Sequence, residues 1–268
     1  MIQCLFVKNE VRITDDPVAL GIEPMNARSV ILSAVLGTHP PELPARSLVA
    51  LAELFGIRAG TARTSLSRMV AKGELDGDDG TYRLAGRLLE RQRQQDSGRT
   101  PAPAGWNGDW IVAIAEHDRR SMAERRSFRN SMIGSRMAEL RPDIWMRPAN
   151  AAAPPATPGV LITSGPLRSD DVDDLVGRLW PLDRLEADAQ DLAEALRHQR
   201  PHLDAGDLGA LPRTFMVAAA VVRFLRIEPQ LPAELAPPTW TPAALRPMYD
   251  DFDASFRVQL AEFFASFD

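Results

Sequence analysis

The chain has 268 residues and carries 31 lysines and arginines against 36 acidic residues, which gives a net charge of −5 at pH 7. Hydrophobic residues make up 45% of it and charged residues 25%, which excludes a wholly disordered or fibrous protein. The single cysteine, Cys4, excludes an intrachain disulfide framework and a cysteine-based zinc site, and favours a reducing compartment. The length suggests two or three domains.

Residues 1–25 precede the first helical pattern and lack the basic start and long apolar run of a secretory signal. We interpret them as an extension without a function of its own. The most apolar stretch, Phe215 to Leu225, is interrupted by Arg223 and is far shorter than the roughly 20 residues that a membrane span needs. It predicts a buried core helix, so we expect a cytoplasmic protein with no membrane partner.

Three helical patterns follow one another between residues 26 and 72. Apolar residues recur three and four positions apart over 26–37, 45–55 and 59–72, which is the spacing of an amphipathic helix. Gly56 predicts a tight turn between the second and third helices, and Gly73 is placed to end the third.

A hairpin pattern comes directly after the third helix. Asp79-Gly80 is a two-residue hairpin turn signal, and Thr81-Tyr82 favours a strand. A polar helix over residues 85–95 completes this region. Helices joined by a short turn and followed by a hairpin are typical of a winged helix-turn-helix, so we predict this DNA-binding fold for residues 26–97.

Residues 97–105 are rich in serine, proline and glycine, which predicts a linker over residues 98–105. Apolar runs and amphipathic patterns then alternate, with expected strands at 110–115, 144–146 and 159–164 and expected helices at 119–136 and 172–179. This order predicts a small ferredoxin-like α+β domain over residues 106–180.

Only helical patterns remain beyond residue 180, at 185–198, 213–226 and 242–267. We therefore expect a helical C-terminal domain over residues 181–268. The predicted fold class is α+β, with an N-terminal winged helix-turn-helix, a ferredoxin-like middle domain and this helical domain.

Several short blocks resemble one known family. They are Ala27-Arg28-Ser29, Thr61 to Val70, Trp106-Asn107-Gly108-Asp109-Trp110, Ile144 to Pro148, and Arg223 to Leu235 followed by Trp240. On these blocks the chain resembles the PaaX-like family of transcriptional regulators, named for the repression of phenylacetic acid degradation genes. It departs from that family in an acidic hairpin, with Asp76, Asp78 and Asp79, and at Arg136-Met137-Ala138, where the family has Gly-Phe-Gly.

The resemblance implies a repressor of a catabolic operon that a small effector, such as an acyl-CoA thioester, releases from DNA. One recognition helix reads only a few base pairs, so we expect a homodimer on a palindromic site in double-stranded DNA. The expected protein is not an enzyme, and it needs no cofactor.

The third helix is the expected recognition helix. With Ala62, Leu66 and Met69 facing inward, the helical period turns the intervening arginine, threonine and serine residues outward. Residues at the helix ends and on the hairpin complete the expected DNA contacts, which are Arg58, Thr61, Arg63, Thr64, Ser67, Arg68, Lys72, Tyr82 and Arg83. Residues 26–95 carry ten basic against seven acidic side chains, a net charge of +3, whereas the remainder of the chain is acidic.

A second basic cluster lies on the expected helix of the middle domain. Arg125, Arg126 and Arg129, together with Trp145, could hold the phosphates of the acyl-CoA effector that the resemblance implies. A solvated or dimer-facing surface explains the same arginines, and core packing explains the tryptophan.

Two further patterns invite other functions. His198 and His202 with Glu194 have metal-like spacing, but Pro201 is expected to break the helix between them. Glu116 and Asp118 end a predicted strand, as in a metal-dependent nuclease on a ferredoxin-like fold, which is our alternative function. A second carboxylate cluster is missing from the pattern, so we predict no metal site and no catalytic residue.

Overall fold

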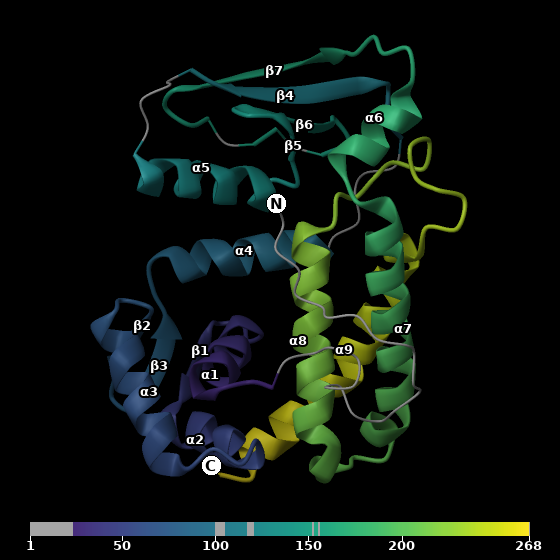
Figure 1. Ribbon diagram of the computed structural model, residues 1–268. Helices are drawn as coiled ribbons and strands as arrows, with labels where there is room; N and C mark the ends of the chain where they lie inside the picture. The colour runs from purple at the N-terminus through teal and green to yellow at the C-terminus, as the bar shows by residue number, and fades with distance from the viewer. Residues whose placement is uncertain (1–23, 100–104, 117–120, 152, 155, 268) are drawn as a thin grey trace. The chain divides into compact units, whose positions relative to one another are not determined.

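The computed structural model describes residues 24–267, except residues 100–104, 117–120, 152 and 155. Helices and short strands are mixed up to residue 166, and helices follow from residue 172 onward (Figure 1). The chain therefore has the predicted α+β fold class, and it divides into two compact units. Residues up to 97, 191–223 and 247–268 belong to the first unit; residues 98–190 and 224–246 belong to the second.

Three packed helices form the start of the first unit: α1 (Ala27–Leu36), α2 (Ala45–Leu54) and α3 (Ala59–Ala71). Their apolar faces are buried as the periodicity predicts, with Ile31, Leu48 and Leu66 almost wholly inaccessible to solvent. Asn26 caps α1 by accepting a hydrogen bond from the backbone N–H of Ser29 at 3.0 Å.

A three-stranded antiparallel sheet accompanies these helices. Its strands β1 (Glu42–Pro44), β2 (Leu75–Asp78) and β3 (Thr81–Leu84) lie in the order β1-β3-β2. Asp79 and Gly80 both have positive φ, at 44° and 77°, as a tight hairpin turn requires. Sequence reasoning missed β1. We refer to the β2–β3 hairpin as the wing of the predicted winged helix-turn-helix.

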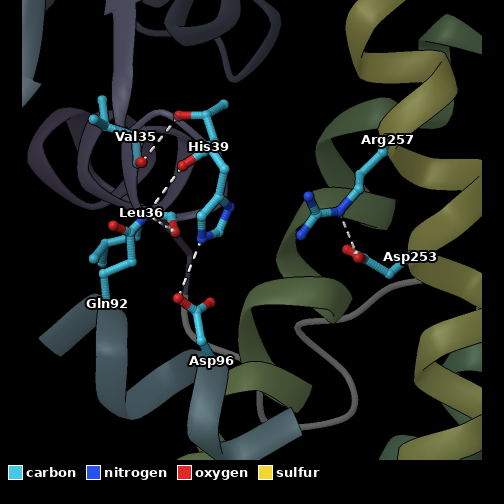
Figure 2. Close-up of polar contacts among 8 residues, drawn as sticks. Val35, Leu36, His39, Gln92, Asp96, Asp253 and Arg257 are labelled. Carbon is cyan, nitrogen blue, oxygen red and sulfur yellow. Dashed lines mark hydrogen bonds and ion pairs between the residues drawn. The ribbon is translucent and has the colours of Figure 1, made fainter. Parts of the chain in front are cut away.

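Helix α4 (Arg87–Arg99) extends four residues beyond the expected helix end and is fixed to the end of α1. The buried amide of Gln92 donates to the carbonyl oxygens of Leu36 and Thr38 at 3.1 and 3.0 Å, and His39 contacts Asp96 at 3.1 Å (Figure 2). The two Gln92 hydrogen bonds satisfy carbonyl groups that a helix end leaves without an internal partner.

The C-terminal helices are α7 (Leu182–Asp204), the short 3₁₀ helix η1 (Leu208–Ala210), α8 (Leu211–Ile227) and α9 (Thr241–Ala265). They do not form a unit of their own over residues 181–268 as we expected, because most of their length belongs to the first unit. There, Phe215 of α8 packs edge-on against Phe55, next to α2, at 5.6 Å and against Phe256 of α9 at 5.9 Å. Within α9, Arg257 donates to Asp253 at 2.6 Å (Figure 2).

The second unit contains a four-stranded antiparallel sheet. Strands β4 (Asp109–Ala115), β5 (Ala138–Arg141), β6 (Ile144–Pro148) and β7 (Val160–Pro166) lie in the order β5-β6-β4-β7, which is the order of a ferredoxin-like sheet. Sequence reasoning missed β5. The described residues between β6 and β7 form no helix, and α6 (Val172–Leu179) follows β7 instead.

Both faces of this sheet are covered by apolar side chains. Helix α5 (Met122–Gly134) packs Phe128 and Met132 against Ile111 and Trp145 on one face. On the other face, α6 and the segment around Leu231 pack against Trp110 and Met146. The sheet is therefore packed between two apolar layers, and alternate residues of β4 face opposite layers.

A buried polar cluster joins β5 and β6 to the connection between α8 and α9 within the second unit. The carboxylate of Glu228 binds the guanidinium of Arg246 and accepts the backbone N–H of Gln230 at 2.8 Å. The side chain of Asn150 donates to the Gln230 carbonyl at 2.6 Å. Burial lowers the pKa of Arg136, which donates to the Leu225 carbonyl, to about 10.

One stretch of the described chain, Leu208–Ile227, is long and apolar enough to cross a membrane by length and composition alone. Of its most apolar window, 61% is buried inside the protein. This burial is that of a core helix, as predicted for Phe215 to Leu225.

Candidate nucleic-acid interface

The outward face of α3 carries the side chains predicted to read DNA. Ala62, Leu66 and Met69 are buried, while the five residues predicted to point outward are all exposed. These are Thr61, Arg63, Thr64, Ser67 and Arg68. Val70 is 39% exposed and lies on the side of α3 next to the wing.

Two of the three short hydroxyl side chains on this face are already used as donors. Thr64 Oγ1 donates to the carbonyl of Gly60 at 2.8 Å, and Ser67 Oγ donates to that of Arg63 at 3.2 Å. Their lone pairs remain, so these hydroxyls can accept from an amino group on a base edge but cannot at the same time donate to a phosphate. Arg63 and Arg68 are the charged donors on this face.

Both ends of α3 carry an exposed cation. Arg58 occupies the N-cap position and Lys72 the C-cap position, and both side chains are exposed. The first turn of α3 consists of Ala59, Gly60 and Thr61, which leaves the positive end of the helix dipole without a local carboxylate.

A groove separates the start of α1 from α3. We call it the α1–α3 groove; its lining includes Asn26, Arg28, Thr61, Thr64, Arg68 and Lys72. Arg28 donates from Nε and Nη2 to the two carboxylate oxygens of Glu74, at 2.9 and 2.8 Å. The hydrogen bond from Arg28 lowers the pKa of Glu74, and the same bond raises the pKa of Arg28.

A second groove, the wing groove, lies between α3 and the hairpin. Ser67 and Val70 line it from α3, and residues 77–82 line it from the wing. Tyr82 is half-buried and lies over Gly77, its partner in the antiparallel register. Arg83 is exposed, contacts Glu42 at 3.4 Å and is paired in register with Asp76. Carboxylates therefore surround the single wing arginine that we predicted to contact DNA.

The basic helix of the middle domain is α5, and its residues have different surroundings. Arg125 and Arg126 are exposed. Arg129 donates to Glu139 at 2.6 Å and lies 5.5 Å above the ring of Trp145, which is only 3% exposed. Arg129 and Trp145 thus meet, but as a contact that holds α5 on the sheet. Effector binding by these four residues stays a prediction.

The residues considered for metal or catalysis do not gather in the described part of the chain. Helix α7 runs through Pro201 to Asp204, so the expected helix break is absent there; His198 contacts Glu194, and His202 contacts Asp207. Glu116 is exposed, and Asp118 lies outside the described residues. No group of three potential metal ligands occurs among the residues that the structure describes.

Comparison with known proteins identifies relatives of this chain. The model of the family described as "PaaX-like protein" matches residues 26–88, which span α1 to the start of α4. A solved structure titled "Uncharacterized protein Rv0674 from Mycobacterium tuberculosis" is similar at 36% identity with a TM-score of 0.64, over 89% of this chain and 98% of that chain. Among curated proteins, none matches the sequence. The chain belongs to the PaaX-like family.

PaaX-like proteins are transcriptional regulators rather than catalysts, and their activity implies DNA as a partner. The family match covers the helices and hairpin that carry the exposed arginines. Sequence reasoning missed Glu74 and Asn26, whose roles depend on neighbours distant in sequence or on local cap geometry.

Proposed function

We propose that this PaaX-like chain is a repressor that binds a palindromic operator as a homodimer through α3. The observation that carries the proposal is the exposed arrangement of Arg63 and Arg68 on a helix whose opposite face is buried. Arginine can donate two parallel hydrogen bonds to guanine O6 and N7, and short neighbouring side chains let the helix backbone approach the groove floor. One such helix reads only a few base pairs, which favours two half-sites and a two-fold dimer.

We further propose that a small effector, such as an acyl-CoA thioester, lowers the affinity for the operator. An effector can do this only by binding one conformation of the regulator more tightly than the other. Arg125 and Arg126 are exposed cations on α5 that suit an anionic ligand, and Arg129 donates to Glu139.

A gel-shift titration with DNA from upstream of the protein's own gene and of its neighbouring genes tests both proposals. We expect a complex with dimer stoichiometry that survives excess mixed-sequence DNA and whose footprint covers an inverted repeat. Phenylacetyl-CoA should dissociate the complex, with free coenzyme A as the control. Failure to bind any of these fragments at low salt would overturn the operator proposal, and an unchanged complex in both ligands would overturn this choice of effector.

A further inference from the structure

The two flanks of α3 carry opposite charge. The α1–α3 groove is lined by three cations, Arg28, Arg68 and Lys72, and by one carboxylate, Glu74. The wing groove is lined by two carboxylates, Asp78 and Asp79, and by no lysine or arginine among the described residues. A duplex that holds α3 in one of its grooves has a phosphate backbone on each side of the helix. The difference in charge between the two flanks of α3 therefore distinguishes one backbone from the other.

Arg28 is held in one orientation at the α1–α3 groove. Glu74, whose side chain is 8% exposed, takes the Nε and Nη2 donors, while the Arg28 side chain remains 43% exposed. The other N–H groups of the guanidinium form no hydrogen bond with the described part of the chain. A guanidinium fixed in this way presents its remaining donors without losing further side-chain entropy on binding.

The start of α1 opens into the same groove. Asn26 and Ala27 line it, and the first turn of α1 consists of Ala27, Arg28 and Ser29. The positive end of the α1 dipole therefore adds to the field of the three cations, while the N–H of Ser29 is already bound by Asn26. A phosphate in this groove would meet side-chain and main-chain donors together.

The wing has the opposite character. Asp76, Asp78 and Asp79 are exposed on its strands and turn, and Arg83 lies between Asp76 and Glu42. A phosphate placed beside three exposed carboxylates is repelled, and the screening length at physiological salt, about 8 Å, does not remove a repulsion at contact distance.

We propose that a duplex touches this winged helix on one side of α3 only: backbone phosphates lie along the α1–α3 groove against Arg28 and Lys72, and the wing is held away from the backbone. Glu74 acts as a positioning residue for Arg28. This inference rests on the proposed DNA-binding function, and it excludes Arg83 from the contacts predicted for it.

A matched pair of single-charge variants tests the proposal. The full chain and the variants Lys72→Gln and Arg83→Gln are titrated by fluorescence anisotropy with a 30-bp mixed-sequence duplex at several salt concentrations. Each phosphate that the protein neutralises contributes about 0.9 to the slope of log K against log salt. We expect Lys72→Gln to reduce the steepness of this slope by about 0.9 and Arg83→Gln to leave it unchanged. An equal loss in both variants, or no loss in Lys72→Gln, would overturn the one-sided contact.

The positioning role of Glu74 predicts a change in DNA affinity opposite in direction to a simple charge effect. Removing a carboxylate from a DNA-binding face strengthens binding if only net charge matters. If Glu74 holds Arg28 for a phosphate, Glu74→Gln instead weakens binding, by roughly 3- to 10-fold, and adds no further loss in the Arg28→Gln background. Titrations run well below the Tm of each variant separate this effect from unfolding. Stronger binding by Glu74→Gln would overturn the positioning role.

These outcomes are distinct from failure of the proposed function. If the unaltered chain binds no duplex at low salt, the proposed function and this inference both fall. If it binds with a salt-dependent affinity that Lys72→Gln does not alter, the function stands and the one-sided contact is wrong.

Discussion

Arg28 and Glu74 are 46 residues apart and form an ion pair with two hydrogen bonds, of 2.9 and 2.8 Å. The pair joins the first turn of α1 to the residue before β2, and so connects the helical part of the winged helix to its hairpin. Glu74 is buried and Arg28 is partly exposed, so water screens the pair from one side only.

We expect Arg28→Ala to destabilise the first unit by roughly 1–3 kcal/mol, because it leaves the buried carboxylate without its charged donor. The matched control is Arg93→Ala, which removes an exposed arginine that contacts Glu90 at 3.1 Å on α4. That change should cost less than about 1 kcal/mol. Thermal unfolding followed by far-ultraviolet circular dichroism compares the two variants, and equal midpoints would contradict a structural role for the pair.

The same pair predicts a pH dependence. The hydrogen bond from Arg28 lowers the pKa of Glu74 in the folded protein below the ordinary value of 4.5. Its stabilising contribution is therefore complete above the unfolded pKa and is lost as the pH falls through the lower, folded pKa. The difference in stability between the unaltered chain and Arg28→Ala should be constant from pH 7 to pH 5 and shrink toward pH 3. A difference that stays the same at pH 3 would contradict this assignment.

Gly77 and Tyr82 set the shape of the wing. A Cβ atom at Gly77 would lie 3.1 Å from Cε1 of Tyr82 and 3.7 Å from Cγ2 of Val70. Gly77→Ala should therefore displace the tyrosine ring and destabilise the hairpin by roughly 1–2 kcal/mol. Gly60→Ala on α3 is the control, because a Cβ there meets nothing within 4 Å and alanine favours a helix. Hydrogen exchange of the β2 and β3 amides should speed up in the first variant only.

Local periodicity predicted the helices of this fold well, because each helix buries a stripe of apolar residues that recur three and four positions apart in the sequence. The burial of Val30, Ile31 and Leu66 follows directly from residue spacing. Strands β1 and β5 were missed because they have only three and four residues, which is too short for an alternation of apolar and polar residues to be recognised. In addition, β5 contains the charged residues Glu139 and Arg141.

Proline was a weaker stop signal than expected. Pro201 lies in the last turn of α7 and removes the hydrogen bond that its N–H would donate to the carbonyl four residues earlier, yet the helix continues to Asp204; Pro247 likewise lies inside α9. The candidate site was predictable where it depends on one helix face, as for Arg63 and Arg68. Pairings such as Arg28 with Glu74 and Arg129 with Glu139 depend on tertiary packing, which spacing does not encode.

Arg63 and Arg68 should dominate operator recognition. We expect Arg63→Ala or Arg68→Ala to weaken operator binding by roughly 1–3 kcal/mol each, since a bidentate arginine–guanine contact has that value. Arg197→Ala on α7 is a control for general loss of charge, because this exposed side chain contacts Glu194 far along the chain from α3. Unchanged binding by both α3 variants in a gel shift at fixed salt would remove α3 from the interface.

The polar cluster around Glu228 should dominate the stability of the second unit. Glu228 is fully buried and binds both Arg246 and the N–H of Gln230, so Glu228→Ala removes the carboxylate from a region that also holds Arg136. Breaking a buried ion pair on one side costs roughly 3–5 kcal/mol. Glu228→Gln keeps an acceptor for the Gln230 N–H and should cost less.

Tryptophan fluorescence isolates this effect, because all five tryptophans of the sequence fall in the ranges of the second unit. We expect the fluorescence midpoint of urea unfolding to fall most in Glu228→Ala, less in Glu228→Gln and not in Arg93→Ala. Unfolding of a chain with two units need not be two-state, so the fluorescence transition is compared with circular dichroism for each variant. A midpoint for Glu228→Ala equal to that of the unaltered chain would mean that relaxation of the cluster offsets the loss of the carboxylate.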